Sequence, residues 1–279
     1  MYEKVENILK LAEEKNTSAI AFICMDHVMA QSVVCAAEAT NTPAIVMLYP
    51  EHVSIQKTCT KKGYAESVKA LANSVKVPIG LHMDHDYTYE ALMDTLDSGF
   101  GSAMMDGSMN DLDTNIRITK QVVDQAHARG AIIEGEIGHV GVAAESENEN
   151  EDLYTKPEAA EKFCRETGVD SLAISIGNAH GEYKGIPHLD IKRLEEIDAA
   201  TDTPLVLHGG SGIPDDQLLV AFSKGIRKFN LGKYYDAVAE FIALNGNNPD
   251  PVKIINMPEF VQSRLQPYLE GRLKTLCHF

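Results

Sequence analysis

The chain has 279 residues, of which 44% are hydrophobic and 24% are charged, so it can bury a large core and is not a disordered segment. Its 41 acidic side chains outnumber the 25 basic ones, which gives a formal net charge of −16. Such a charge repels nucleic acid and anionic membranes, so we expect neither as a partner unless a local basic patch is present. An anionic small molecule must be held by local groups.

The sequence contains no sign of a membrane span or a secretion signal. No run of about 18 or more apolar residues is present, and residues 1–6 lack the basic start and apolar core of a signal peptide. The five cysteines are an odd number at scattered spacings, which indicates reduced thiols rather than a disulfide framework or a cysteine zinc knuckle. We therefore expect a soluble, cytoplasmic protein.

Short apolar runs rich in β-branched residues recur along the chain and alternate with amphipathic stretches such as 115–127. There are eight runs, at 19–23, 43–48, 77–81, 101–105, 131–133, 171–176, 204–207 and 227–231. This alternation is typical of a parallel sheet with helices on both faces. Eight units in one chain of this length predict an α/β fold of the (β/α)8 TIM-barrel type, with a doubly wound sheet as the runner-up. No linker divides the chain, so we expect a single domain over 1–279, with a helical C-terminal extension from about 247.

Polar side chains gather where the predicted strands end. Asp84 and His85 follow the third run, His180 the sixth and His208 the seventh. In a (β/α)8 barrel these ends form the active-site face, so residues far apart in sequence converge there. Taken singly, each histidine is more often a structural residue. Jointly, three imidazoles on one rim resemble the ligand set of a catalytic zinc.

The other histidines show no such placement. His82 is left open, because alternation along the strand would point it the same way as Asp84. The rest are interpreted as surface or loop residues: His27, His52, His127, His139, His188 and His278.

A glycine-rich loop follows the seventh run, with Gly209, Gly210 and Gly212 around Ser211. Glycines let the backbone approach an anion closely, and Pro214 and the two aspartates after it are typical of a first helical turn facing the same loop. Glycines also serve ordinary turns, but a position after strand seven of a barrel favours phosphate binding.

Five motifs carry a family resemblance: "LHMDHD", "GFGSAMMDGS", "IIEGEIGHVG", "GVDSLAISIGNAHGEYKG" and "PLVLHGGSGIP". They resemble the class II, zinc-dependent ketose-bisphosphate aldolases, the family of fructose- and tagatose-bisphosphate aldolases, and they occur in order over most of the chain. The resemblance implies a lyase of carbohydrate metabolism that cleaves a ketose phosphate reversibly into a dihydroxyacetone-phosphate-like donor and an aldehyde. It also implies a Zn2+ ion, or another divalent metal, that stabilises the enediolate, with a monovalent cation as a further option. A homo-oligomer, dimer or tetramer, is expected.

The resemblance also assigns roles to residues of this sequence. It implies metal ligation by His85, His180 and His208. It implies that Asp84 exchanges a proton with the C4 hydroxyl and that Glu136 lies near the metal with Glu134 in support. It also implies a catalytic glutamate in a mobile loop over 140–153, for which Glu145 is the nearest candidate and Glu147 and Glu149 are the next. It implies substrate and phosphate binding by Gly181, Lys184, Gly209, Gly210, Ser211, Asn230 and Lys233.

Three substrate loops depart from the family pattern. Lys233 stands where a small hydroxyl residue is usual, Tyr49 replaces a serine after the second strand, and Asp26 and His27 replace asparagines. We expect Lys233 and Tyr49 to fill the pocket that holds the donor half. The metal and proton-transfer residues are intact, so the chemistry looks preserved and the substrate changed. The alternative is an aldolase-fold metal-binding protein with a sensing or regulatory role, but such a protein needs no general base, so Asp84 and Glu136 favour an enzyme.

Overall fold

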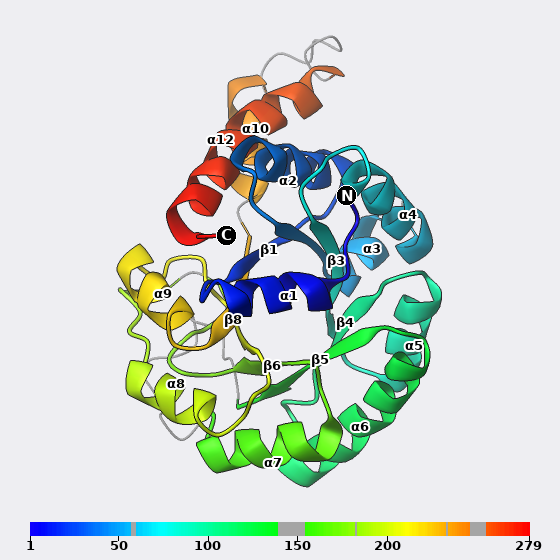
Figure 1. The fold of residues 1–279 in the computed structure, drawn as a ribbon. Coiled ribbons are helices and arrows are strands. Elements are labelled where there is room, and N and C mark those ends of the chain that lie inside the picture. Colours follow the sequence, from blue (N-terminus) through cyan, green and yellow to red (C-terminus); the bar gives the residue numbers. More distant parts are fainter. Residues whose placement is uncertain (57–59, 139–153, 182, 233, 246–254) are drawn as a thin grey trace.

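The computed structural model describes residues 1–56, 60–138, 154–181, 183–232, 234–245 and 255–279. Eight parallel strands close into a barrel in chain order, each paired with the next and β8 with β1 (Figure 1). The predicted TIM barrel is confirmed, and the doubly wound sheet is wrong because that sheet would be open.

Each predicted apolar run coincides with a strand. The strands are β1 (Ala19–Ile23), β2 (Ala44–Leu48), β3 (Ile79–Asp86), β4 (Ser102–Met105), β5 (Ile132–Ile137), β6 (Ser171–Ile174), β7 (Leu205–Leu207) and β8 (Ile226–Leu231). The helices are α1 (Val5–Glu14), α2 (His27–Thr40), α3 (Pro50–Gln56), α4 (Lys61–Ala72), α5 (Tyr89–Asp97), α6 (Leu112–Ala128), α7 (Pro157–Thr167), α8 (Ile191–Asp198), α9 (Asp215–Phe222), α10 (Tyr234–Asn245) and α12 (Met257–Leu276).

Two strands extend further than their apolar runs indicated. The prediction ended the third strand at residue 81 and the fifth at 133, whereas β3 continues to Asp86 and β5 to Ile137. Every residue in both strands is buried, including the charged ones. His85 therefore lies inside β3 instead of following it. Apolar periodicity misses such residues because they are polar side chains buried against other segments, as His85 is against Asp106 and Glu134 against His208.

Helix α1 lies across the N-terminal end of the barrel (Figure 1), where Tyr2 pairs with Ile79 at the start of β3. Its apolar residues pack on the ends of β1 and β2 in a separate buried cluster. Gly80 makes this contact possible, since a Cβ there would lie 2.9 Å from Val5 Cγ2 and 3.1 Å from Ile8 Cδ1. The floor of the barrel is thus closed by one helix.

The C-terminal extension is helical over α12, which packs against α2, α9 and α10 outside the barrel (Figure 1). Its buried residues recur at helical spacing: Val261, Leu265, Leu269, Leu273 and Leu276. In the part of the chain that the structure describes, no helix combines the length and apolarity that a membrane crossing requires.

The close packing of α1 predicts the effect of a single methyl group. Gly80→Ala should lower the free energy of unfolding by about 1–3 kcal/mol, because the new Cβ overpacks the floor of the barrel. Gly271→Ala is the matched control: Gly271 is exposed in α12 with no atom within 4 Å of the added Cβ, so stability should rise by up to about 1 kcal/mol. Urea unfolding measures both. Equal stabilities would contradict the tight contact.

Candidate active site

A cavity of about 1040 Å³ opens at the carboxyl end of the strands, where the sequence analysis expected the active site. Each of the eight strands, or the loop after it, contributes to the lining, which includes Ile23, Tyr49, Asp84, Asp106 and Glu136. The barrel topology alone brings these segments together, because parallel strands present all their carboxyl ends to one rim.

The three histidines of the expected metal site meet in this cavity. Their ring nitrogens offer one ligand atom each within 4.8 Å of one another, so the cluster could hold a metal ion. Ring centroids lie 5.0 Å apart for His85 and His208, 5.3 Å for His85 and His180, and 5.7 Å for His180 and His208. A second group, His85 with Asp106 and Glu136, also brings ligand atoms this close.

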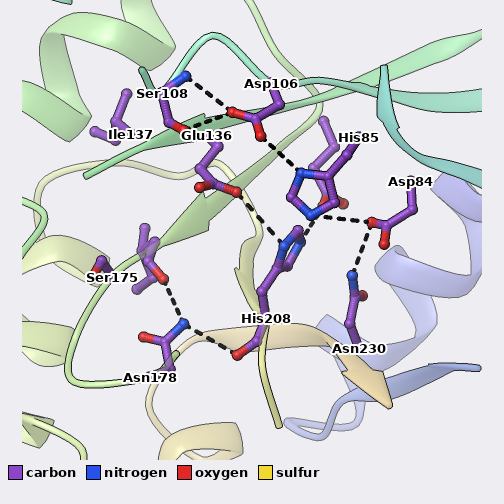
Figure 2. Close-up of polar contacts among 12 residues, drawn as sticks. Asp84, His85, Asp106, Ser108, Glu136, Ile137, Ser175, Asn178, His208 and Asn230 are labelled. Atoms are coloured by element: carbon purple, nitrogen blue, oxygen red, sulfur yellow. Dashed lines mark hydrogen bonds and ion pairs between the residues drawn. The ribbon is translucent and has the colours of Figure 1, made fainter. Parts of the chain in front are cut away.

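Hydrogen bonds to carboxylates orient two of the imidazoles, and Figure 2 shows the one between His85 and Asp106. His208 Nε2 bonds Glu134 Oε1 at 2.9 Å, while its buried Nδ1 has no hydrogen-bond partner. His85 Nδ1 bonds Asp106 Oδ2 at 2.9 Å, which leaves Nε2 facing the cavity. Metal-binding histidines show this pattern, with one nitrogen bound to a carboxylate and the other available as the ligand. The orphaned Nδ1 of His208 fits a metal ion.

A backbone irregularity aims Asp84 and His85 into the same cavity. Successive strand residues normally point to opposite faces. Here His85 has φ 45°, in the left-handed region, and the pairing of β3 with β4 shifts register between Met83 and Asp86. Asp84 and His85 both line the cavity, whereas Asp86 accepts a 2.6 Å hydrogen bond from Thr95 Oγ1 in α5. Strained residues and bulges of this kind cluster at functional sites.

A buried polar chain leads from the barrel interior to Asp84. Lys228 Nζ donates to Glu134 Oε2 at 3.0 Å and to Asn230 Oδ1 at 2.8 Å. Asn230 Nδ2 in turn donates to Asp84 Oδ1 at 3.2 Å (Figure 2). Sequence analysis missed Lys228, although a lysine between Ile226 and Leu231 in an apolar run was a visible signal. Asn230, which was assigned to phosphate binding, lines the cavity and also supports Asp84.

The charges of this cluster are set by burial and by neighbouring groups. Burial alone would lower the pKa of His85, but the Asp84 and Asp106 carboxylates outweigh it and raise that pKa to about 9. Burial, and then the nearby His208, lowers the pKa of His180 to about 4. Burial, and then Asp106, raises the pKa of Glu136 to about 8. A bound cation would favour the ionised carboxylate and the neutral imidazoles.

The glycine-rich loop follows β7 and lines the cavity together with Gly181. Gly209 has φ 65°, and a Cβ there would lie 2.1 Å from the Ala179 carbonyl oxygen. Ser211 Oγ donates to the Gly232 carbonyl oxygen at 3.0 Å, which ties the loop to the end of β8. Helix α9 begins at Asp215, so its first turn lies where the proline and aspartates predicted it.

Other residues that the sequence predicted for the site either do not line the cavity or lie outside the described part of the chain. Lys184 is exposed and does not line the cavity. Lys233, Glu145 and the whole of the expected mobile loop over 140–153 lie outside the described residues. His82 faces the barrel interior, as alternation suggested, 2.7 Å from Ser102 Oγ.

His52 corrects the interpretation of the remaining histidines. Sequence analysis placed it on the surface or in a loop, but it lies in α3 and lines the cavity, with its Nδ1 buried and without a hydrogen-bond partner. The short helix α3 turns its side chain inward, which periodicity over seven residues could not reveal. Four other histidines are exposed as expected: His27, His127, His188 and His278.

Tyr183 joins the two loops that carry the second and third histidines. Its hydroxyl accepts a hydrogen bond from the Ala179 amide at 2.8 Å and donates one to the Gly209 carbonyl at 2.9 Å. These partners precede His180 and follow His208. Sequence analysis missed this residue, because neither contact has a signature in the local pattern.

Residues 3–272 match the model of the family described as fructose-bisphosphate aldolase class-II. The chain belongs to this family. It is therefore a class II aldolase, a carbon–carbon lyase of a family that uses a divalent metal.

Individual relatives differ in the substrate that their names state. This chain is 39% identical to a fructose-bisphosphate aldolase of Geobacillus stearothermophilus over 206 residues, which cover 69% of this chain and 72% of the relative. It is 44% identical to a 6-phospho-5-dehydro-2-deoxy-D-gluconate aldolase of Shouchella clausii over 157 residues, 56% of this chain and 53% of that one. The solved YdjI aldolase of Escherichia coli K12 superposes with a TM-score of 0.87 at 28% identity, covering 99% of this chain and 98% of the other.

Metal content tests the histidine cluster. Replacing His85, His180 or His208 by Ala should each remove most of the bound divalent metal and nearly all activity, because two imidazoles hold zinc far less tightly than three. His188→Ala is the control, since that side chain is exposed outside the cavity. Elemental analysis of the purified variants gives the result. Normal metal content in two of the three variants would refute the assignment.

Tyr183→Phe tests whether the loops are held by one hydroxyl. Losing both hydrogen bonds should lower the free energy of unfolding by about 1–2 kcal/mol and weaken metal affinity by about tenfold, since His180 is no longer fixed. Tyr89→Phe, at the start of α5, is the control. Metal titration and urea unfolding are measured together. A loss of stability with unchanged metal affinity would show that Tyr183 does not position the histidine.

Proposed function

We propose that this protein is a zinc-dependent aldolase that reversibly cleaves a ketose phosphate into a dihydroxyacetone-phosphate-like donor and an aldehyde. One observation carries the proposal: the orphaned, buried Nδ1 of His208 lies in the same cavity as His85, His180 and the carboxylate of Asp84. A metal site and a proton acceptor side by side are the two parts that aldol cleavage needs.

The three histidines would hold the ion, and imidazole nitrogens are ligands that suit zinc. When bound, zinc acts as a Lewis acid on the carbonyl group of the substrate. Glu134 and Asp106 fix the orientation of His208 and His85 through their other ring nitrogens. The partly exposed His180 would be the most accessible to solvent of the three ligands.

Asp84 would accept the proton of the C4 hydroxyl during cleavage and return it during condensation. Burial would raise its pKa, but His85 and then His208 and Lys228 outweigh burial and lower it, so the carboxylate is ionised and able to act as a base. Asn230 donates to one of its oxygens, and Lys228 fixes the amide of Asn230 so that its nitrogen faces Asp84. Glu136, with an oxygen that has no hydrogen-bond partner, is the second carboxyl group at the site.

The donor phosphate would bind at the glycine loop. Gly181, Gly209, Gly210 and Ser211 line this side of the cavity, and helix α9 begins three residues beyond Gly212. Backbone amides of such a loop favour an anion. Lys233 and Lys184 as further phosphate ligands, and Glu145 as the loop acid/base, stay predictions, as do the homo-oligomeric state and the cytoplasmic location.

Asp84→Ala should separate proton transfer from metal binding. Metal content should stay near that of the unmodified protein, while cleavage falls by about a hundredfold or more, the scale of a lost general acid/base. Metal analysis and a coupled aldehyde-release assay on a panel of ketose phosphates measure the two quantities. If metal and activity disappear together, Asp84 has a ligand role and the proposed division of labour is wrong.

A further inference from the structure

The cavity has two unlike sides. The glycine loop follows β7, and β3 lies across the closed barrel from β7, four strands away in either direction. After β2 and β3 the cavity is lined by Tyr49, His52 and Tyr87, here called the tyrosine wall. Tyr49 therefore narrows the side of the cavity opposite the glycine loop. The donor phosphate is proposed to bind at the glycine loop, so Tyr49 does not fill the donor pocket as the sequence led us to expect.

The tyrosine wall is one connected group of polar aromatic side chains. The hydroxyl groups of Tyr49 and Tyr87 lie 3.3 Å apart. The ring of Tyr49 meets His52 edge to face at 5.5 Å, and Tyr87 stacks on the metal-site histidine His85 at 6.2 Å with an interplanar angle of 22°. A substrate with one end at the glycine loop and its middle at the metal site would therefore place its other end against this wall.

The wall offers hydrogen-bonding groups without positive charge. Its polar groups are two phenol hydroxyls and the His52 imidazole, whose buried Nδ1 has no hydrogen-bond partner. None of the described residues lining the cavity is lysine or arginine, and the lining carboxyl groups are those of Asp84, Asp106, Glu136 and Asp236. A second phosphate dianion here would lose its hydrating water without gaining a cationic partner. Sugar hydroxyls, in contrast, can replace each hydrogen bond to water by one to the wall.

We propose that the tyrosine wall binds the aldehyde half of the substrate, and that this half is an uncharged polyhydroxylated chain. The substrate is then a ketose monophosphate, with its single phosphate at the glycine loop. This inference rests on the proposed aldolase function and names its substrate class.

Three assays on the metal-loaded protein test the proposed aldolase function and the tyrosine-wall proposal separately. The first is exchange of the C3 proton of dihydroxyacetone phosphate with deuterated water, which needs the donor alone. The other two are condensations of dihydroxyacetone phosphate with D-glyceraldehyde and with D-glyceraldehyde 3-phosphate. We expect proton exchange, and a kcat/KM at least about tenfold higher for D-glyceraldehyde than for D-glyceraldehyde 3-phosphate. The phosphorylated aldehyde would bring a phosphate dianion to a wall that offers it no cationic partner.

The outcomes are distinguishable. Absence of proton exchange would refute the proposed function itself. Exchange together with a preference for the phosphorylated aldehyde would leave the aldolase function intact and overturn the tyrosine-wall proposal. The phosphate would then be held by a cation beyond the described lining, and Lys57 is the one nearest to the wall in sequence.

Variants test the wall directly. Tyr49→Phe, Tyr87→Phe and His52→Phe should each raise the KM for D-glyceraldehyde about three- to tenfold, the effect of one neutral hydrogen bond, and change proton exchange much less. Tyr2→Phe is the control, because Tyr2 pairs with Ile79 at the other end of β3. An unchanged KM for the aldehyde in all three variants would contradict the proposal.

Adding a positive charge to the wall should change which aldehyde is preferred, and a variant that merely fails to fold would not show such a change. Tyr87 is 54% exposed at the cavity mouth, so Tyr87→Arg can be accommodated without repacking the core. The new cation should shift the ratio of kcat/KM values toward D-glyceraldehyde 3-phosphate by about tenfold or more. An unchanged ratio in a variant that still exchanges the donor proton would place the aldehyde half elsewhere.

Discussion

An ammonium group buried inside the barrel organises both halves of the site. Lys228 is fully buried, and a charge in that position is tolerated only when it is paired and hydrogen-bonded. Its partner Glu134 also accepts the hydrogen bond that orients His208, and its other partner, Asn230, donates to Asp84. His208, a proposed metal ligand just after β7, and Asp84, the proposed proton acceptor on β3, are thus both positioned through one ion pair.

The backbone at His85 contributes a second constraint. A regular strand could direct either Asp84 or His85 into the cavity, but not both. The left-handed residue and the register shift against β4 direct both inward, at a cost in backbone strain of order 1–3 kcal/mol. Asp106 and Asp86, bonded to His85 and Thr95, hold the chain on either side of this irregularity.

The two sides of the cavity differ in their relation to the family motifs. The histidines, Asp84 and the glycine loop belong to the motifs by which the sequence resembles the class II aldolases. The tyrosine wall stands after β2 and β3, and Tyr49 is one of the positions at which the sequence departs from the family pattern. Relatives whose names state different substrates show that the family fold does not specify the sugar. This is consistent with the proposal that side chains outside these motifs bind the aldehyde half.

The sequence by itself determined the barrel, its eight strands and the rim on which His85, His180, His208 and Asp84 meet. It could do so because parallel strands of a closed barrel always present their carboxyl ends to one face, so that order along the chain implies convergence in space. Only the tertiary structure decided how far β3 and β5 run, that His52 faces the cavity, and that Tyr183 joins two loops. It also decided the pairing of Lys228 with Glu134, 94 residues apart. Polar groups that satisfy one another inside a core leave no periodic pattern in the sequence, because each is buried by its distant partner and not by its own hydrophobicity.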